Sequence, residues 1–342
     1  MKAGAISDHR NICYGIAAVM IILTHSARYV PEHFIMYKLL LYMNLGVPIF
    51  AFLSGMGIYY SLKIKRNTTK QFYANRLNRV LVPYLCIMGL GFGVLHLVAS
   101  FNPMLFLYRL SALKFWVEGD NLWYIAMLIP VYLLAPIYSN WVEKGQRGLK
   151  TAVTSGIFVV ALLVLAYYLP DLYARYHIVL RTAIVLLLGY YWGECISRNE
   201  RIKITWPIIF ALLYLGQAIF RRVVGENIIL DTAVNSFSFA LLGVPLILFL
   251  TFVIDFVTKR MSGVKTAVLR LCSSIGKVSL ESYLFNFLCG LLFRALLKEW
   301  NISQLAFPWI WMCYVVGVGG IGVLLSFLMN WFLQKIRTKN VR

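Results

Sequence analysis

The sequence predicts an all-α polytopic membrane protein with about ten transmembrane helices and both termini in the cytoplasm. Hydrophobic residues make up 61% of the 342 residues and charged residues only 13%, and the mean hydropathy is +0.75. A soluble domain carries about 25% charged residues. Apolar runs of about 20 residues recur along the chain, and each is long enough to cross about 30 Å of hydrocarbon.

Ten spans are expected from these runs. They cover residues 11–30, 39–62, 80–100, 122–141, 150–169, 178–197, 204–222, 236–258, 279–298 and 307–334. The first run is too long for a signal-peptide core and no small-residue cleavage site follows it, so we expect it to be retained. No soluble domain or linker interrupts the succession, which predicts a single integral-membrane domain over residues 1–342.

The basic residues orient these spans. Most of the 33 Lys and Arg residues fall at cytoplasmic span ends if the N-terminus is cytoplasmic, as the positive-inside rule requires. The segment KIKRNTTKQFYANRLNR, residues 63–79, contributes six basic residues and no acidic one. The net charge of +20 therefore follows from topology, with the lipid bilayer as partner and no nucleic acid. We expect a multi-pass protein of the cytoplasmic (inner) membrane, with residues 101–121 as an interfacial or re-entrant outer connection.

No pattern indicates a metal or a permanently bound cofactor. The six cysteines are scattered singly and show no CxxC or Cys/His spacing, so we expect neither a metal site nor disulfides. GVGGIG at residues 317–322 resembles a dinucleotide fingerprint, but it lies within a span with no strand before it. Close helix packing is therefore the favoured interpretation.

A titratable side chain lies inside the first span, in YGIAAVMIILTHSARYV, residues 14–30. His25 follows Arg10 by 15 positions, about 22 Å at 1.5 Å per residue, which places it in the outer half of the membrane. A polar group there needs a partner or a hydrated cavity. Two interpretations stay open: an imidazole hydrogen-bonded to a neighbouring helix, or a general base or proton relay.

Two further patterns are compatible with a reaction site. Arg76 and Arg79, in NRLNR, are three residues apart, so a helical turn would point both guanidinium groups the same way, and such donors suit phosphate. A basic cluster that only sets topology is the alternative. Ser54, Gly55 and Gly57 interrupt the second span, which permits close helix packing or leaves a cavity.

Taken in order, these pieces resemble the acyltransferase-3 family, integral-membrane acyltransferases of which many O-acetylate bacterial glycans. The matching segments are RNICYGIAAVMIILTHSA, VPIFAFLSGMGIYYSLK, YANRLNRVLVPY, NLWYIAMLIPVYLLAPI and GKVSLESYLFNF. Each motif is loose, but their succession over most of the chain is specific.

The resemblance implies roles for individual residues. His25 falls on the family's catalytic histidine, and Arg76 and Arg79 fall on the cytoplasmic RxxR pair associated with the acyl donor. The possible pocket residues are Ser54 in span two, Trp123 and Tyr124 in span four, and Ser279, Tyr283 and Asn286 in span nine.

The chain departs from the family pattern at two positions. The family usually has Arg or Lys eleven residues before the histidine, where this chain has Tyr14. Arg10 and Tyr14 are an i,i+4 pair, so Arg10 could reach toward the same cavity. Many members also have a histidine after YL in span nine, where Asn286 stands here.

The implied enzyme is an O-acetyltransferase-type acyltransferase, with acetyl-CoA or another acyl-CoA as co-substrate and a hydroxyl of an extracytoplasmic or lipid-linked glycan as acceptor. Arg76 and Arg79 would hold the donor phosphates, while His25 would deprotonate the acceptor hydroxyl or take the acyl group transiently. Tyr14 and Arg10 would support the reaction by stabilising the thioester oxyanion or positioning the donor arm.

Two glutamates lie at membrane depth, where charge is costly. Glu194, near the inner end of span six, is expected to pair with a cation such as Arg198. Glu281, in span nine, either orients the imidazole of His25 or pairs with a cation such as Lys277.

Two other functions are compatible with the sequence. A proton-coupled transporter or flippase of a glycolipid or small solute would use the intramembrane Glu281, Glu194 and His25 as coupling groups, although no repeated halves with matching broken helices are visible. A catalytically inactive acyltransferase-like protein is the third possibility, because Tyr14 replaces the basic residue of the family.

Overall fold

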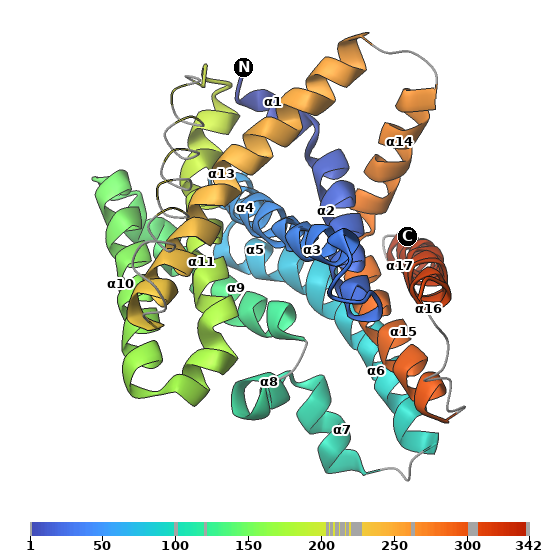
Figure 1. Cartoon of the computed structure of the whole chain (residues 1–342). Coiled ribbons are helices and arrows are strands. Elements are labelled where there is room, and N and C mark those ends of the chain that lie inside the picture. The colour runs from blue at the N-terminus through green and yellow to red at the C-terminus, as the bar shows by residue number, and fades with distance from the viewer. Residues whose placement is uncertain are drawn as a thin grey trace. The chain divides into compact units, whose positions relative to one another are not determined.

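Helices make up the computed structural model of the chain, and no strand forms among the residues that it describes (Figure 1). These are residues 2–98, 102–119, 122–202, 228–260, 264–299 and 307–339, with single positions at 205, 208, 212, 216 and 219. Nine helices in this part of the chain are long and apolar enough to cross a membrane. The all-α polytopic fold class is thus confirmed, while the cytoplasmic placement of both termini stays a prediction.

The candidate spans follow the predicted ones. They are Arg10–Tyr29, Ile35–Ile64, Thr69–Val94, Trp123–Val142, Arg147–Tyr168, Pro170–Ser197, Leu242–Arg260, Ser279–Glu299 and Trp309–Lys335. Apart from single positions, the predicted span at residues 204–222 lies outside the described residues. Many apolar side chains on these helices are exposed on the surface of the chain, for example Ile137, Phe249 and Leu324, as expected for helices that face lipid.

The third span begins well before the predicted residue 80, because the basic segment is itself helical. Helix α5 (Thr69–Arg76) starts after a reciprocal cap at Thr68. The Thr68 amide donates to Oε1 of Gln71 at 2.9 Å, and the Gln71 amide donates to Oγ1 of Thr68 at 3.3 Å. This capping box satisfies two amide groups that a helix N-terminus leaves unpaired.

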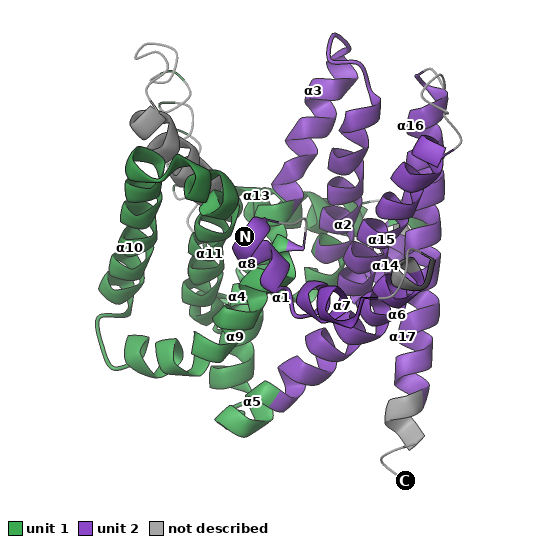
Figure 2. Ribbon diagram, turned by 90° about the horizontal axis from the view of Figure 1, so that it is seen from below, with its two compact units in different colours: residues 1–13, 47–73, 123–268 green, residues 14–46, 74–122, 269–342 purple. Residues whose placement is uncertain are grey.

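Two units share the chain, and their segments alternate along it (Figure 2). Unit 1 comprises residues 1–13, 47–73 and 123–268, and unit 2 comprises residues 14–46, 74–122 and 269–342. The single domain over residues 1–342 stays a prediction.

Unit 1 is a helical bundle in which α11 packs against both α10 and α13. Its elements are α1 (Gly4–Asp8), nearly all of α4 (Gly46–Tyr59), the π-helical turn η3 (Tyr60–Ile64), the start of α5, α9 (Trp123–Val142), α10 (Arg147–Tyr168), α11 (Pro170–Ser197) and α13 (Ile228–Arg260).

Helices α4 and α11 touch backbone to backbone. A Cβ atom at Gly55 would overlap the carbonyl oxygen of Leu186 on α11, and one at Gly189 would overlap the backbone of Phe52 on α4. Only glycine permits such an approach. The small residues in the second span therefore serve packing at Gly55, whereas a Cβ at Gly57 would have nothing within 4 Å.

Unit 2 is organised around α15, which packs against α6, α17 and η6. Its elements are α2 (Arg10–Ser26) from Tyr14 onward, η1 (Ala27–Tyr29), α3 (Ile35–Tyr42), η2 (Met43–Leu45), the end of α5, η4 (Leu77–Leu81), α6 (Val82–Val98), α7 (Pro103–Leu110), α8 (Leu113–Glu118), most of α14 (Val264–Lys277), α15 (Ser279–Glu299), α16 (Trp309–Cys313), η6 (Tyr314–Gly320) and α17 (Ile321–Lys339).

The glycine-rich segment 317–322 lies at the end of η6, a π-helical turn, and the start of α17. A Cβ at Gly319 would press on Ile22 of α2, and one at Gly322 would contact the backbone of Asn286 on α15. The predicted role in helix packing is therefore confirmed for these two glycines.

The predicted outer connection, residues 101–121, forms two short helices within its described part, α7 and α8. The side chain of Asn102 caps α7 by accepting a hydrogen bond from the Leu105 amide at 3.1 Å. The hydroxyl of Tyr84 on α6 donates to the Leu110 carbonyl at 2.9 Å. Exposed apolar side chains on these helices suit an interfacial position, for example Met104, Leu107 and Val117.

The close approach at Gly55 can be tested by comparison with Gly57. Gly55→Ala forces a methyl group into the α11 backbone, an overpacking expected to cost about 1–3 kcal/mol. Gly57→Ala adds the same group to open space and gains helix propensity of about 1 kcal/mol. In detergent, the first variant should melt several degrees below the wild type and the second at or above it. Equal melting temperatures would contradict the backbone contact.

Candidate functional site

His25 lies in the last turn of α2, just before the 3-10 turn η1. Its side chain is partly buried. Ser26, the next residue, accepts a hydrogen bond from Nε1 of Trp311 on α16 at 2.9 Å. Among the described residues, no hydrogen bond to the imidazole itself is formed. The end of the helix is held by its neighbour, and the imidazole forms no hydrogen bond within the described residues; both predicted roles of His25 stay predictions.

Two arginines stand beside His25. Nε of Arg28, one turn further along the chain, donates to the His25 carbonyl at 3.1 Å. Arg294 lies on α15 next to Phe293, whose ring packs on Tyr29 at the end of the first span. Arg28 is exposed and Arg294 is partly buried. Within the described chain, neither guanidinium forms an ion pair with a carboxylate.

Three aromatic rings hold this part of unit 2 together. The ring centroid of Tyr29 lies 5.5 Å from that of Phe293 and 4.9 Å from that of Tyr314, and Phe293 and Tyr314 are 5.7 Å apart. The rings come from η1, α15 and η6. The buried hydroxyl of Tyr29 has no hydrogen-bond partner in the described structure. We call His25, Arg28, Tyr29, Arg294 and Tyr314 the His25 cluster.

Four members of the His25 cluster were missed in the sequence: Arg28, Tyr29, Arg294 and Tyr314. Arg28 is three residues after His25 and so lies on a neighbouring part of the helix surface, which is a usable signal. Arg294 is a cation within an apolar span, which is also informative. The two tyrosines have no distinguishing signal among the 21 in the chain.

Helix α15 also presents two buried oxygen atoms without partners. Asn286, one of the predicted pocket residues, is 4% exposed, and Ser282 is 2% exposed. Within the described residues, neither Oδ1 of Asn286 nor Oγ of Ser282 accepts or donates a hydrogen bond. Four residues apart, they share one face of the helix. A buried oxygen left unpaired costs about 1–3 kcal/mol, so this face is suited to a polar ligand.

The other predicted residues of span nine lie at the start of α15. Ser279 is its first residue, and Tyr283 is partly buried one turn later. Glu281 is 8% exposed in the first turn, where the helix dipole stabilises a carboxylate. It precedes Arg294 by 13 residues, about 20 Å along the axis. Both predicted roles of Glu281, orienting His25 or pairing with a cation, stay predictions.

The RxxR pair spans a change in helix type. Arg76 is the last residue of α5, and Arg79 lies within the π-helical turn η4. A π-turn holds more residues per turn than an α-helix, so the angle between the two side chains is not that of a regular α-helical turn. That both guanidinium groups point the same way stays a prediction. Arg76 is partly buried and Arg79 is exposed. Such turns occur mostly as single bulges and often at functional sites.

Three predicted pocket residues meet in unit 1. The hydroxyl oxygens of Ser54 on α4 and Tyr124 on α9 are 3.1 Å apart, in hydrogen-bond contact. The rings of Trp123 and Tyr124 pack edge to face with centroids 5.5 Å apart. Motifs from spans two and four therefore converge. Of the two supporting residues on α2, Arg10 is exposed and Tyr14 is partly buried.

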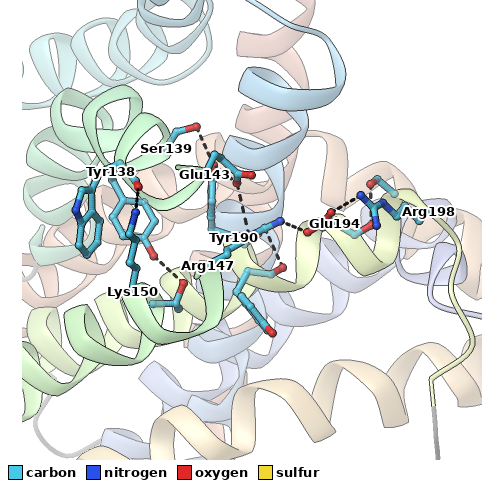
Figure 3. Close-up of polar contacts among 12 residues, drawn as sticks. Tyr138, Ser139, Glu143, Arg147, Lys150, Tyr190, Glu194 and Arg198 are labelled. Carbon is cyan, nitrogen blue, oxygen red and sulfur yellow. Dashed lines mark hydrogen bonds and ion pairs between the residues drawn. The ribbon is translucent and has the colours of Figure 1, made fainter. Parts of the chain in front are cut away.

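The predicted pairing of Glu194 with Arg198 is confirmed, and Arg147 joins it (Figure 3). Arg147, at the start of α10, lies 2.5 Å from a Glu194 carboxylate oxygen and donates to the carbonyl oxygens of Tyr190 and Tyr191 at 2.8 and 2.9 Å. Its guanidinium carbon is 4.7 Å from the ring centroid of Tyr59.

Tyr190 extends this network to α9. Its hydroxyl donates to Oγ of Ser139 at 2.8 Å and lies 3.2 Å from Oε1 of Glu143 (Figure 3). Glu143 is also 3.6 Å from Nε of Arg147. The network joins α9, α10 and α11, and its charges are neutralised within the protein, so we assign it to structure rather than to chemistry.

In the part of the chain that the structure describes, no three His, Cys, Asp or Glu side chains lie close enough together to bind a metal ion. All six cysteines are free thiols.

Comparison with known families places the chain in one of them. A family model described as an acyltransferase domain, Acyl_transf_3, matches residues 13–331. The chain belongs to the acyltransferase-3 family. The match covers nearly the whole chain, including all of the quoted motifs except residues 10–12 of the first, and this acyltransferase is a multi-pass membrane protein. Searches among curated proteins and among solved structures found no match.

The structural role of Arg147 can be separated from that of Arg198, because both pair with Glu194. The Arg147 side chain is 12% exposed and that of Arg198 is 66% exposed. Arg147→Gln removes one ion-pair partner from each of Glu194 and Glu143 and the donor to two carbonyls, at a cost of about 3 kcal/mol, whereas Arg198→Gln removes an exposed pair worth about 0–1 kcal/mol.

Melting curves of the purified variants should therefore show a clear loss of thermal stability for Arg147→Gln and little change for Arg198→Gln. Similar small losses for both would show that the network does not stabilise unit 1.

Proposed function

We propose that this acyltransferase transfers an acyl group, in the simplest case acetyl, from cytosolic acyl-CoA to a hydroxyl of a glycan that is extracytoplasmic or lipid-linked. The observation that supports the proposal is the imidazole of His25. It is partly buried at the end of α2 and is unpartnered among the described residues, and Arg28 lies one turn further along the chain and donates to the His25 carbonyl.

The basic segment between spans two and three is the proposed donor end. Arg79 is exposed and, within the described residues, forms no ion pair, so it is available for a phosphate of the donor. Arg76, Lys63 and Lys65 lie on the same short stretch of chain and add positive charge. Charge-assisted hydrogen bonds from Arg to phosphate are about twice as strong as neutral ones.

The face of α15 with Ser282 and Asn286 is the proposed path of the donor's pantetheine arm. The arm contains amide groups that can donate to Oδ1 of Asn286. Asn286 precedes Arg294 by eight residues, about 12 Å along α15, so an arm bound there would approach the His25 cluster. Tyr14, eleven residues or about 16 Å before His25 on α2, suits contact with the arm better than with the thioester.

The chemical step needs one base in contact with the acceptor. In the direct route, a ring nitrogen of His25 accepts the acceptor's hydroxyl proton while the oxygen attacks the thioester carbonyl. The C–S bond then breaks, the ester forms and the thiolate of CoA leaves, to be protonated from the imidazolium or water. In the alternative route, the imidazole attacks first, and the acyl-imidazole is then attacked by the hydroxyl.

The role of His25 can be tested against a second histidine. His25→Ala should abolish both release of the CoA thiol and acylation of the acceptor by protein purified from glycan-producing membranes, because no other described group replaces the base. His33→Ala, an exposed residue that stacks on Phe34, should keep wild-type turnover. Expression and melting temperature of both variants should be unchanged.

Wild-type thiol release by His25→Ala would remove the proposed catalytic role. Uptake of a glycolipid or solute into vesicles by the wild type, without any CoA release, would instead support the transporter or flippase.

The donor end can be tested by single charge reversals on neighbouring turns. Arg79→Glu should raise the Michaelis constant for acetyl-CoA about 10-fold or more, because it removes a charge-assisted hydrogen bond of about 1.5–3 kcal/mol, and the double reversal of Arg76 and Arg79 should raise it further. Lys70→Glu, an exposed residue of α5, changes the charge equally and should have a small effect. Equal effects would show that the segment sets topology only.

A further inference from the structure

We propose that Arg28, Tyr29, Arg294 and Tyr314 of the His25 cluster form a binding site for an anionic group, a carboxylate or phosphate, on the acceptor, so that this enzyme acylates an acidic glycan. The assignment of this anion to the acceptor rests on the proposed function, whereas the binding of an anion beside His25 does not.

The first argument is the uncompensated charge. Arg28 donates to the His25 carbonyl, and Arg294 follows Phe293, whose ring packs on Tyr29 at the end of α2; no carboxylate of the described chain pairs with either arginine. Two like charges near the end of one helix repel each other, and partial burial makes the charge of Arg294 more costly. An anion bound between them would relieve both costs.

The second argument is a comparison with Arg147, an arginine that has a structural role in the same chain. Arg147 is surrounded by Glu143, Glu194 and two carbonyl oxygens, so its charge is neutralised within unit 1. Arg294 is given none of these partners, although it projects from a membrane-spanning helix where an unpaired charge is expensive. The difference indicates that the partner of Arg294 comes from outside the chain.

The third argument is the convergence of donors beside one glycine. At the buried Gly290 on α15, the place that a Cβ atom would occupy is 3.9 Å from Nη1 of Arg294 and 3.7 Å from the hydroxyl oxygen of Tyr314. The guanidinium and the hydroxyl therefore approach the same point on α15. The buried hydroxyl of Tyr29, whose ring packs on Tyr314, is unpartnered among the described residues. Guanidinium and hydroxyl donors around one space match the several oxygens of a carboxylate or phosphate.

The position of the cluster identifies which substrate would supply the anion. Arg294 is 13 residues along α15 from Glu281, about 20 Å, and therefore lies at the far end of that helix from its first turn. In the proposed orientation this is the outer end, whereas the phosphates of acyl-CoA bind at the inner end. An anion beside His25 at the outer end then belongs to the acceptor, and it would fix the acceptor's hydroxyl against the imidazole.

The test uses the full-length protein in nanodiscs of phosphatidylcholine, with glucuronate and glucose 1-phosphate as anionic probes and glucose as the neutral probe at equal ionic strength. The anionic probes should raise the melting temperature in a saturable manner, and glucose should not. Arg294→Gln should weaken their apparent affinity about 10-fold or more, the loss of a charge-assisted hydrogen bond, while Arg294→Lys should retain part of it.

Arg175→Gln is the matched control, because Arg175 is a partly buried arginine on α11 that stacks on Tyr176 and lies in unit 1. It should bind the probes as the wild type does. His25→Ala should also bind them while having no turnover, so that loss of the catalytic proposal and loss of the anion site give different results.

No stabilisation by either anionic probe, or equal stabilisation of wild type and Arg294→Gln, would overturn the proposal. Nanodiscs of phosphatidylglycerol test whether the bound anion is instead a lipid headgroup. If this lipid stabilises the protein through Arg294 while the sugar probes do not, the anion is a lipid headgroup and the acidic acceptor is wrong.

Discussion

The cost of an unpaired charge inside a membrane is the constraint on which the rest of this structure depends. Each cation at membrane depth needs an anion, a carbonyl or water. The chain meets this need internally at Arg147, where carboxylates and carbonyls surround the guanidinium and join three helices. It leaves Arg294 without such partners in its described part. Comparison of these two arginines separates a group that stabilises the fold from one that is kept available for a ligand.

Hydropathy was enough to predict the spans, because length and apolar composition decide which segments cross a bilayer. The early start of the third span also had a local signal, Thr68 followed by Gln71 three residues later, a capping box that the charge of the segment obscured. The π-turn that contains Arg79 had none, because a π-turn arises from packing around the helix rather than from its residue types.

The candidate site was predicted in part. The motifs named His25, Asn286, Ser54 and Tyr124, and the structure brings the last two into contact. Arg294 was missed because a sequence shows that a cation lies in a span but not which helix its side chain meets. Arg294 also bears on the substitution at Tyr14. In the family, a basic residue stands eleven positions before the histidine. Here the cations near the end of α2 are Arg28, from the same span, and Arg294, from α15.

The π-turn η6 sets the register of the last membrane span. The extra residue of this turn rotates α16 and the start of η6 relative to α17. Trp311 therefore reaches Ser26, and Tyr314 reaches Tyr29. The face of α17 that packs against α15 is kept. One residue corresponds to about 100° of helix rotation. A lineage that lost a single residue from this turn would keep a membrane-spanning helix of almost unchanged length, yet it would turn these two aromatic side chains away from the end of α2.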